Sequence, residues 1–282
     1  GFIDKKGRVV IAYKYRRIED FSEGLAPVEI ERDKWGFVNS SGTLAIPCIY
    51  EQTTGFSEGL VCVKKNGLWG YIDKTGKTVL PFKYKKPSLF KNGLAVCDST
   101  TGEYVKFGFM NKQGKLVIPA IYFQAGEFSD GLAYALNDKM KWGFIDTTGK
   151  PVIPFNYVQA FPFVEGMASV TDGSSGWGYI NKQGKLIIPY STTPGFFSDG
   201  MLAACENQFG GKYGYYNNKG KLIIPFKFDS AERFVNGIAP AKMIKDGKEV
   251  WGFIDKTGNT VIQFIYSEAS SFSEDHSAVA SM

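Results

Sequence analysis

Hydrophobic and polar residues alternate along the chain in short runs, which polar, glycine-containing turns separate. Three runs recur together and read Trp-Gly-Phe-Ile-Asp, Lys-x-Val-Ile-Pro and Gly-Leu-Ala-x-Val. Each has the length of a β-strand and ends at turn residues. No segment of useful length has the helical period of about 3.6 residues. The pattern therefore predicts an all-β protein built from three-stranded antiparallel meanders.

These runs return at intervals of 34 to 38 residues. An aromatic residue followed by glycine marks each return, at Trp35-Gly36, Trp69-Gly70, Phe107-Gly108, Trp142-Gly143, Trp177-Gly178, Tyr213-Gly214 and Trp251-Gly252. Gly1 opens a further copy in mid-motif. A fixed period of this size is typical of repeat architectures. We expect one domain over residues 1–282 with eight tandem units of about 35 residues, starting near 1, 35, 69, 107, 142, 177, 213 and 251.

A turn with fixed chemistry joins the first two strands of every unit. All eight copies carry Asp or Asn after the first strand: Asp4, Asn39, Asp73, Asn111, Asp146, Asn181, Asn217 and Asp255. All eight carry glycine three residues later: Gly7, Gly42, Gly76, Gly114, Gly149, Gly184, Gly220 and Gly258. The Asx side-chain oxygen can cap such a turn, and glycine can adopt the left-handed conformation that closes it. The spacing predicts a short hairpin with a bulge.

Proline follows the second predicted strand in six copies, at Pro47, Pro81, Pro119, Pro154, Pro189 and Pro225. Since proline has no amide hydrogen to donate, we expect strand pairing to stop there. The link beyond it, around Tyr50 or Tyr84, is a candidate for a fourth, irregular strand.

The first strand is apolar on both faces, which determines how the units assemble. Alternation places Trp35 and Phe37 on one face and Gly36 and Val38 on the other. Each unit must then be covered on both faces by its neighbours. A closed eight-bladed β-propeller and an open β-solenoid both satisfy this requirement.

Two features favour the propeller. The small residues of Gly-Leu-Ala-x-Val suit the innermost strand of a blade, and pairing of residues 277–282 with residues 1–4 would close a ring and remove two exposed edges. A unit of about 35 residues is short for a propeller blade, which keeps the solenoid as the alternative.

The combined motif, with Phe-Ser-Glu-Gly-Leu-Ala-x-Val after Trp-Gly-Phe-Ile-Asp, resembles the WG-repeat family of mostly bacterial proteins. The resemblance covers essentially all 282 residues. It implies a binding or interaction role, and family members are often attached to further domains. The departures are local: Phe107 and Tyr213 replace Trp, Thr192 stands where Tyr is expected, and Asp275-His276 interrupts the last copy.

Composition adds mainly exclusions. The formal net charge is +5, with lysines and acids interspersed and no basic run, which favours an ordinary surface over a nucleic-acid site. The apolar runs are too short to span a membrane. Because Gly1 lies in mid-motif, we expect the natural N-terminus upstream, and the compartment stays open. Four cysteines without paired spacing, Cys48, Cys62, Cys97 and Cys205, are interpreted as small core or strand residues.

Nothing in the sequence assembles an enzyme. His276 is the single histidine, so a histidine-based triad or an all-histidine metal site is excluded. No phosphate-binding glycine loop is present. We predict a non-catalytic protein with no catalytic residues, no metal ligands and no cofactor.

One set of acidic residues precedes the third-strand glycine: Glu23, Glu58, Asp130, Glu165, Asp199 and Glu274. In a closed ring these would circle one mouth of the channel and form a candidate site for a cation or a basic peptide. The alternative is structural: each carboxylate bonds nearby backbone amides or a lysine of its own Asp-Lys-x-Gly-Lys turn. Repetition in nearly every copy favours the structural role.

The repeated tryptophans suggest a second function, stacking against sugars. Phe107 and Tyr213 replace them without loss of the motif, however, and tolerance for any large aromatic is typical of a packing position. A carbohydrate-binding, lectin-like module is therefore the alternative function.

The hairpins before each Trp-Gly pair differ between copies. The longest are residues 98–106 and 243–250, and a third spans 206–212. Binding residues concentrate on variable loops that a rigid scaffold holds. We therefore expect a scaffold that binds protein or peptide through this edge. The candidate binding residues are Tyr104, Met140, Phe209, Lys106 and Lys245.

Overall fold

The computed structural model describes residues 1–3, 8–11, 13–86, 88–98, 104–207, 209–271 and 280–281. Over these residues the chain forms thirty β-strands and no helix, which confirms the all-β prediction. Two compact units divide the chain: unit 1 comprises residues 1–131, 135–138 and 147–150, and unit 2 comprises residues 132–134, 139–146 and 151–282.

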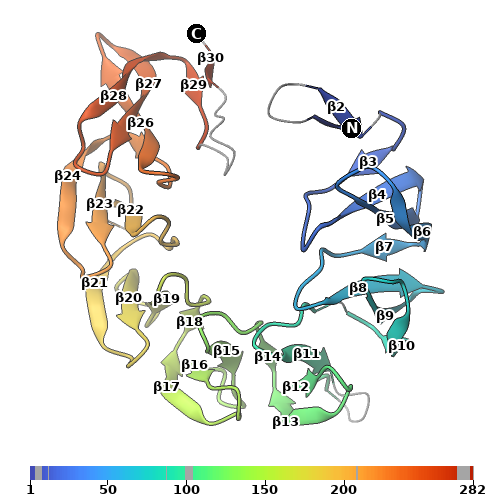
Figure 1. Ribbon diagram of the computed structural model, residues 1–282. Helices are drawn as coiled ribbons and strands as arrows, with labels where there is room; N and C mark the ends of the chain where they lie inside the picture. Colours follow the sequence, from blue (N-terminus) through green and yellow to red (C-terminus); the bar gives the residue numbers. More distant parts are fainter. Residues whose placement is uncertain are drawn as a thin grey trace. The chain divides into compact units, whose positions relative to one another are not determined.

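Unit 1 contains successive antiparallel sheets (Figure 1). A two-stranded pair comes first, β1 (Phe2–Ile3) and β2 (Val9–Ile11). The next sheet has the order β3 (Arg17–Ile18), β4 (Leu25–Glu31), β5 (Lys34–Asn39), β6 (Leu44–Tyr50). The third is formed by β7 (Gln52–Thr53), β8 (Leu60–Lys65), β9 (Leu68–Asp73) and β10 (Thr78–Tyr84). The fourth has three strands, β11 (Leu94–Asp98), β12 (Phe107–Asn111) and β13 (Leu116–Tyr122).

The following sheet has the order β14 (Gln124–Ala125), β15 (Ala133–Leu136), β16 (Trp142–Ile145), β17 (Pro151–Tyr157). Unit 2 continues with β18 (Gln159–Ala160), β19 (Met167–Thr171), β20 (Trp177–Asn181) and β21 (Leu186–Thr192). A three-stranded sheet follows, β22 (Met201–Cys205), β23 (Tyr213–Asn217) and β24 (Leu222–Phe228). Then come β25 (Ser230–Ala231), β26 (Ile238–Lys245), β27 (Lys248–Asp255) and β28 (Thr260–Tyr266), and the pair β29 (Glu268–Ala269) and β30 (Ala280–Ser281).

The link between repeats supplies the fourth strand of most sheets. In β7 it contributes two residues, with Gln52 paired to Lys64 and Thr53 to Val63 of β8. In the four-stranded sheets the Gly-Leu-Ala-x-Val strand is therefore second in order and not at the edge, which corrects its expected innermost place. The sheets that start at β11 and β22 lack a short strand in the described part of the chain. Their links carry Pro87 and Pro194, and proline disfavours regular pairing.

The repeated prolines lie inside the outer strand of each sheet and not at its end. In β6, Ile46 pairs with Phe37 and Tyr50 pairs with Trp35, so three residues around Pro47 face a single residue of β5. The extra residues form a β-bulge, in which they are not paired in the regular ladder. A proline there, which has no amide hydrogen, therefore removes no ladder hydrogen bond. The prediction that pairing stops at proline is therefore wrong, because pairing resumes at Tyr50.

The bulge also explains the glycine of each Trp-Gly pair. A Cβ atom added to Gly36 would lie 2.5 Å from the Ile46 carbonyl oxygen and 2.7 Å from the Cys48 amide nitrogen. Both neighbours are backbone atoms of the bulge and cannot move aside easily. Close approach, and not an unusual backbone angle, makes glycine necessary here.

The predicted Asx turns are confirmed. The Asn39 Oδ1 atom accepts hydrogen bonds from the amides of Ser41 (3.1 Å) and Thr43 (3.0 Å), and Gly42 has φ +81°. The same pattern recurs at Asp255, which accepts the amides of Thr257 and Asn259, each at 2.9 Å.

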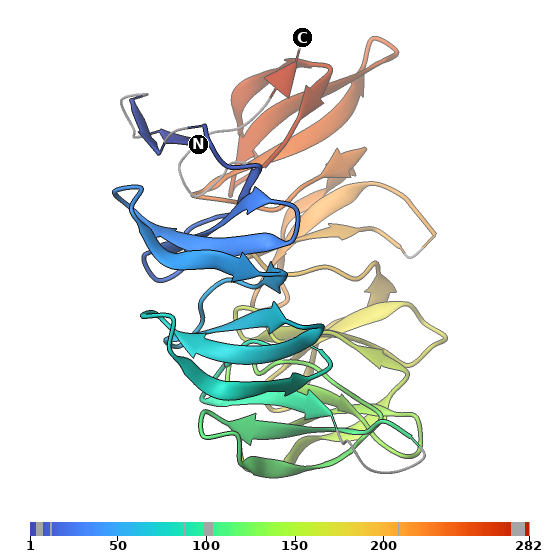
Figure 2. The same cartoon turned by 90° about the vertical axis from the view of Figure 1, so that its right-hand side faces the viewer.

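Packing on both faces of the sheets is also confirmed. The sheets β3–β6 and β7–β10 are stacked next to each other (Figure 2). Between them, Trp35 and Phe37 of β5 pack against Val61 of β8 and against Phe56, which lies in the link before β8. On the opposite face Val38 joins a cluster that contains Ile11, Ala26, Val28 and Cys48. Each sheet thus buries two apolar faces, and the core of each unit is a series of inter-sheet layers.

The segment 277–282, predicted to pair with residues 1–4, lies outside the described residues except for Ala280 and Ser281. Closure of a ring therefore stays a prediction, with the open solenoid as its alternative.

Candidate functional site

The acidic residues of the Phe-Ser-Glu-Gly motif lie in two-residue turns. Ser22 and Leu25 exchange both backbone hydrogen bonds, at 2.9 and 3.1 Å. Between them, Glu23 has φ +50° and Gly24 has φ +88°, the signs of a type I′ turn. Glycine tolerates this conformation, whereas a glutamate adopts it only at a cost of about 1–2 kcal/mol. An additional interaction must therefore hold Glu23 in place.

That interaction reaches the next sheet. The Glu23 carboxylate accepts the Gly59 amide at 3.1 Å and lies 3.0 Å from the Lys74 ammonium. We call this carboxylate–amide–lysine arrangement the turn staple. Lys74 belongs to a later copy of the repeat than Glu23. The prediction that the acid pairs with a lysine of its own copy is therefore wrong.

The turn staple recurs in both units. Glu58 binds the Gly93 amide at 3.0 Å and Lys112 at 3.2 Å. In unit 2, Asp199 binds the Gly237 amide at 2.6 Å and Lys256 at 2.7 Å. Glu165 accepts the amides of Asp199 and Gly200, both at 2.8 Å.

The pKa values of these acids reflect their partners. Burial alone would raise the pKa of Glu23, but the hydrogen bonds from Lys74 and Gly59 hold it below its ordinary value. Burial alone would likewise raise the pKa of Asp199, but the Lys256 ammonium and the Gly237 amide lower it below its ordinary value. Both carboxylates are therefore ionised at neutral pH.

The serine of the same motif also bridges sheets. Ser22 Oγ accepts the Phe56 amide, and Ser57 Oγ donates to the Phe90 carbonyl oxygen, both at 2.7 Å. Ser198 Oγ donates to the Phe234 carbonyl oxygen at the same distance.

The remaining members of the predicted acidic set are placed as follows. Asp130 lies in an equivalent turn with φ +53°, and Glu274 lies outside the described residues, as does His276. Within the described ranges, no group of three or more His, Cys, Asp or Glu side chains converges as a metal site would require. The acids lie in a row along one end of the sheets of each unit.

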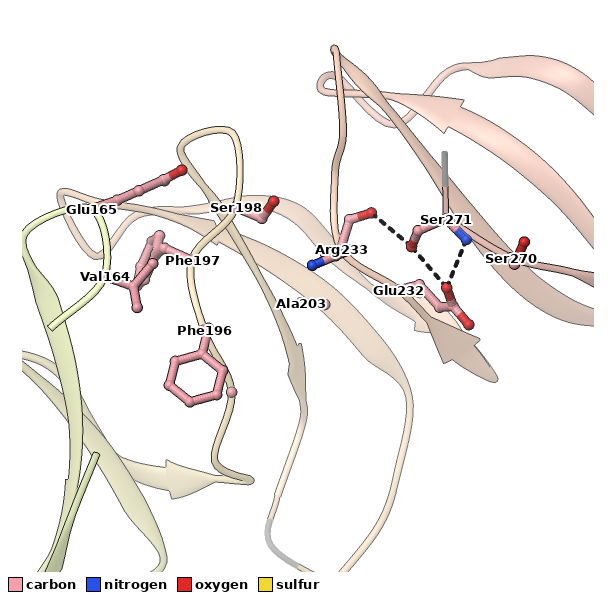
Figure 3. A pocket seen from close by; sticks show the side chains of 11 residues that line it. Val164, Glu165, Phe196, Phe197, Ser198, Ala203, Glu232, Arg233, Ser270 and Ser271 are labelled. Carbon is pink, nitrogen blue, oxygen red and sulfur yellow. Dashed lines mark hydrogen bonds between the residues drawn. The ribbon is translucent and has the colours of Figure 1, made fainter. Parts of the chain in front are cut away.

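Unit 2 carries a groove of about 900 Å³ along four successive links (Figure 3). Its walls include Glu165, Phe196, Glu232 and Ser271. The Glu232 Oε2 atom accepts the Ser271 amide (3.0 Å) and hydroxyl (2.8 Å), and Phe196 is half exposed. Sequence reasoning placed Glu165 in the acidic set and assigned the other three residues no role. Phe196 could have indicated this groove from the sequence, because most other links carry a small or polar residue at the same position.

The predicted binding residues lie on the hairpins at the opposite end of the sheets. Phe209 is 91% exposed, Tyr104 64% and Met140 60%. Tyr104 and Lys106 belong to unit 1, and the Lys106 ammonium lies 4.9 Å from the Phe123 ring centroid. Met140 and Phe209 belong to unit 2. Much of the long hairpin at 98–106 lies outside the described residues.

The segment 243–250 is not a variable loop. It continues the ladder of β26 and β27 up to the pair Lys245–Lys248, and Asp246 and Gly247 form a two-residue turn with φ +51° and +75°. Lys245 is exposed at the tip of this hairpin.

The tryptophans occupy packing positions. Trp35 and Trp69 are buried, and Trp142, Trp177 and Trp251 are half-buried. The four cysteines are free; Cys48, Cys62 and Cys205 are buried and Cys97 is half-buried. Within the described part of the chain no helix is long and apolar enough to cross a membrane.

Comparison with solved structures gives low sequence identity and broad coverage. The crystal structure of the computationally designed Ika8 protein matches at 12% identity with a TM-score of 0.51, covering 96% of this chain and 98% of that one. This likeness concerns the fold alone. BamB from Moraxella catarrhalis matches at 12% identity (TM-score 0.46, 84% and 79% covered), and the WD40 beta propeller domain of Doa1 at 11% (TM-score 0.37, 81% and 89% covered); no conclusion rests on these two. No curated protein sequence matches.

The repeats themselves match a family model, described as the WG containing repeat. It matches eight times, over residues 1–34, 35–69, 69–96, 107–139, 142–174, 177–208, 213–248 and 251–280. The matches begin at or near every predicted unit start and together span nearly the whole chain. A tandem-repeat β fold of this kind favours a binding or scaffold role in general. The chain belongs to the WG containing repeat family.

Proposed function

We propose that this chain is a non-catalytic scaffold that binds protein or peptide through the hairpins at the sheet ends opposite the turn staples. The observation that carries the proposal is the exposure of large apolar side chains there, Phe209 above all, at 91%. Interface cores favour such aromatic anchors, and an isolated exposed phenylalanine on a glycine-rich hairpin has no packing role in the fold.

The division of labour within each sheet supports the same proposal. The turn ends are occupied by contacts between sheets, such as Glu23 with Gly59 and Lys74. The hairpin ends carry different side chains in different copies: Asn66 and Gly67 in one, Asp172 and Ser174 in another. Binding specificity can change at the hairpin ends without disturbing the stack.

Protein is favoured over carbohydrate as the ligand. Repeated sugar sites would need the same exposed aromatic and polar side chains in most copies. The exposed hairpin residues instead differ, and the repeated Trp35 and Trp69 are buried.

The test is site-specific photo-crosslinking in the native host. A photoreactive residue replaces Phe209, Tyr104 or Met140 in separate variants, and Ile121, a half-exposed apolar residue of β13, serves as the matched control. We expect discrete polypeptide adducts from the hairpin positions and none from Ile121. Adducts from Ile121 alone would refute the proposal, and specific signals on a glycan array that vanish with the hairpin substitutions would replace protein by carbohydrate.

A further inference from the structure

Arginine is nearly confined to the first repeat. Four of the five arginines, Arg8, Arg16, Arg17 and Arg32, lie within the first 32 residues, whereas lysine is the usual cation in the other copies. A residue type that is concentrated in one copy marks a place where that copy departs from the common plan. Three of these arginines gather at the hairpin end of the sheet β3–β6, next to β3 and in the β4–β5 turn.

A buried carboxylate organises this end of the sheet. Glu29 of β4 is only 2% exposed. Its Oε2 atom lies 2.6 Å from Arg16 Nη1 and 3.7 Å from Arg17 Nε, and its Oε1 atom accepts the Asp33 amide at 3.0 Å. Burial alone would raise the pKa of Glu29, but Arg16, the Asp33 amide and Arg17 lower it below its ordinary value. The ionised carboxylate holds Arg16 and the hairpin in one arrangement.

The arginines keep most of their hydrogen-bonding capacity. The side chains of Arg16, Arg17 and Arg32 are 46%, 64% and 85% exposed. In the part of the chain that the structure describes, the Arg17 guanidinium has no hydrogen-bond partner. A planar guanidinium with free N–H groups matches the two oxygens of a carboxylate.

The local charges leave a positive surplus. Arg32 lies 3.9 Å from Asp33, and Lys34 pairs with Glu31 at 2.6 Å. Together with Arg16 and Arg17 against Glu29, four cations face three anions. The irregular register between Glu29 and Glu31 also leaves Ile30 44% exposed beside them.

In two other sheets the equivalent link residue is acidic, and in two more it is Phe123 or Val158. The Arg16 amide donates to the Glu29 carbonyl oxygen at 2.7 Å. The same backbone bond joins Glu51 to Lys64 (2.9 Å) and Asp229 to Lys242 (2.8 Å). This link residue is acidic in those two sheets, whereas in the sheet β3–β6 it is Arg16, and Arg17 follows it.

We propose that Arg16, Arg17 and Arg32 form a docking site for an acidic peptide segment, with Ile30 as the adjoining apolar contact. The inference rests on the proposed function and specifies the chemistry of one partner. Acidic side chains complement the surplus charge, and a peptide suits a site this small. A nucleic-acid backbone would need a longer track of cations than this patch, which Glu31 and Asp33 interrupt.

The test measures fluorescence anisotropy of a labelled peptide, Glu-Glu-Glu-Leu-Glu-Glu-Glu, titrated with the full chain at low salt. We expect binding that weakens as salt rises, because exposed charges are screened. The double variant Arg17→Glu/Arg32→Glu should bind at least about tenfold more weakly, and Arg17→Lys/Arg32→Lys should lie between it and the parent. Both leave Arg16 in place beside Glu29, and circular dichroism of each variant checks that it folds as the parent does. The lysine pair keeps a positive charge beside Glu29, so a graded loss of binding in it does not depend on a buried charge repulsion.

Arg233→Glu is the matched control, since it reverses the one arginine outside the first repeat. It should leave peptide affinity unchanged. No binding by the parent chain, or an equal loss in Arg233→Glu, would overturn the inference. Photo-crosslinked partners at Phe209 that persist in Arg17→Glu/Arg32→Glu would then show that the proposed function survives without this site.

Discussion

The two ends of each sheet differ in what their residues contact. At the turn end, a carboxylate reaches the next sheet, as Glu58 does to Gly93 and Lys112. At the hairpin end, contacts are mostly local: the Asp172 carboxylate accepts the amides of Ser174 and Ser175 within its own hairpin. Where one residue must fit a neighbouring copy, its type is largely kept: six of the eight copies carry an acid there, and Asn92 and Asn236 stand in the other two. Where contacts stay within a hairpin, the residues are free to change, and function can develop there.

A pair of aspartates in unit 2 compares the two ends of a sheet most directly. Asp199→Ala removes the partner of the Gly237 amide and of Lys256, and we expect it to lower the free energy of unfolding by about 2 kcal/mol. Asp172→Ala breaks only local hairpin bonds and should lower it by about 0.5 kcal/mol. Urea denaturation of both variants measures the difference. Equal losses would mean that the turn end contributes no more to stability than the hairpin end.

Acid should weaken the turn end first. Glu23 and Asp199 have pKa values below their ordinary 4.5 and 3.8, so their stabilisation is complete above those values and is lost as pH falls through the lowered ones. Asp255, whose pKa is lowered to about 2, extends the loss to lower pH. We expect the free energy of unfolding to be flat from pH 7 to 5 and to fall below about pH 4.5. Asp199→Asn should flatten that fall in denaturation curves at pH 3 to 7.

Backbone strain in the staple can be separated from its bonds. Glu58 adopts φ +53°, a conformation that Asn92 and Asn236 share at the same turn position of other copies. Glu58→Asn relieves strain while it removes the staple, whereas Glu58→Gln removes the charge and keeps the strain. We expect Glu58→Gln to be the less stable of the two by about 0.5–1 kcal/mol in thermal unfolding. The reverse order would mean that a hydrogen bond to the Gly93 amide, which a glutamine side chain can keep, outweighs the backbone strain.

The hairpin end should show the smallest effect on stability. Phe209 is 91% exposed, so Phe209→Ser should change the free energy of unfolding by less than about 0.5 kcal/mol. The same change at Phe197, which is buried in the same sheet's core, should cost about 3–5 kcal/mol or more. Circular dichroism during heating compares the two. A large loss from Phe209→Ser would assign that ring a folding role and remove it from the binding surface.

The repeat pattern predicted the local chemistry of the turns and not the contacts between copies. Asn39 and Gly42 lie within one turn, so their spacing suffices to predict a capped hairpin. Glu23 instead finds its amide and its lysine 36 and 51 residues away in the next sheet. The amide lies one repeat away, but the period alone does not say that the turns of neighbouring copies meet. Pro47 was misread for a related reason, because a bulge depends on how the partner strand aligns.

The candidate site was predicted unevenly. Phe209 was predicted as a binding residue because its hairpin differs in sequence from those of the other copies. Hairpin length alone could not distinguish the regular ladder ending at Lys245 from a loop, since extra residues can extend either. The net charge of the chain did not reveal the arginines of the first copy, because Glu29, Glu31 and Asp33 offset most of their positive charge.

The proline bulge of the outer strands bears on self-association. An outer strand exposes unpaired backbone groups, and in β6 it also exposes Leu44 and Ile49, each about half. Such an edge invites strands of other molecules to add to it, which is how β-rich proteins aggregate. Pro47 supplies no amide hydrogen, and the bulge breaks the regular spacing of those that remain. An incoming strand therefore meets no long register to pair with, and many similar edges can coexist in one chain without adding to one another.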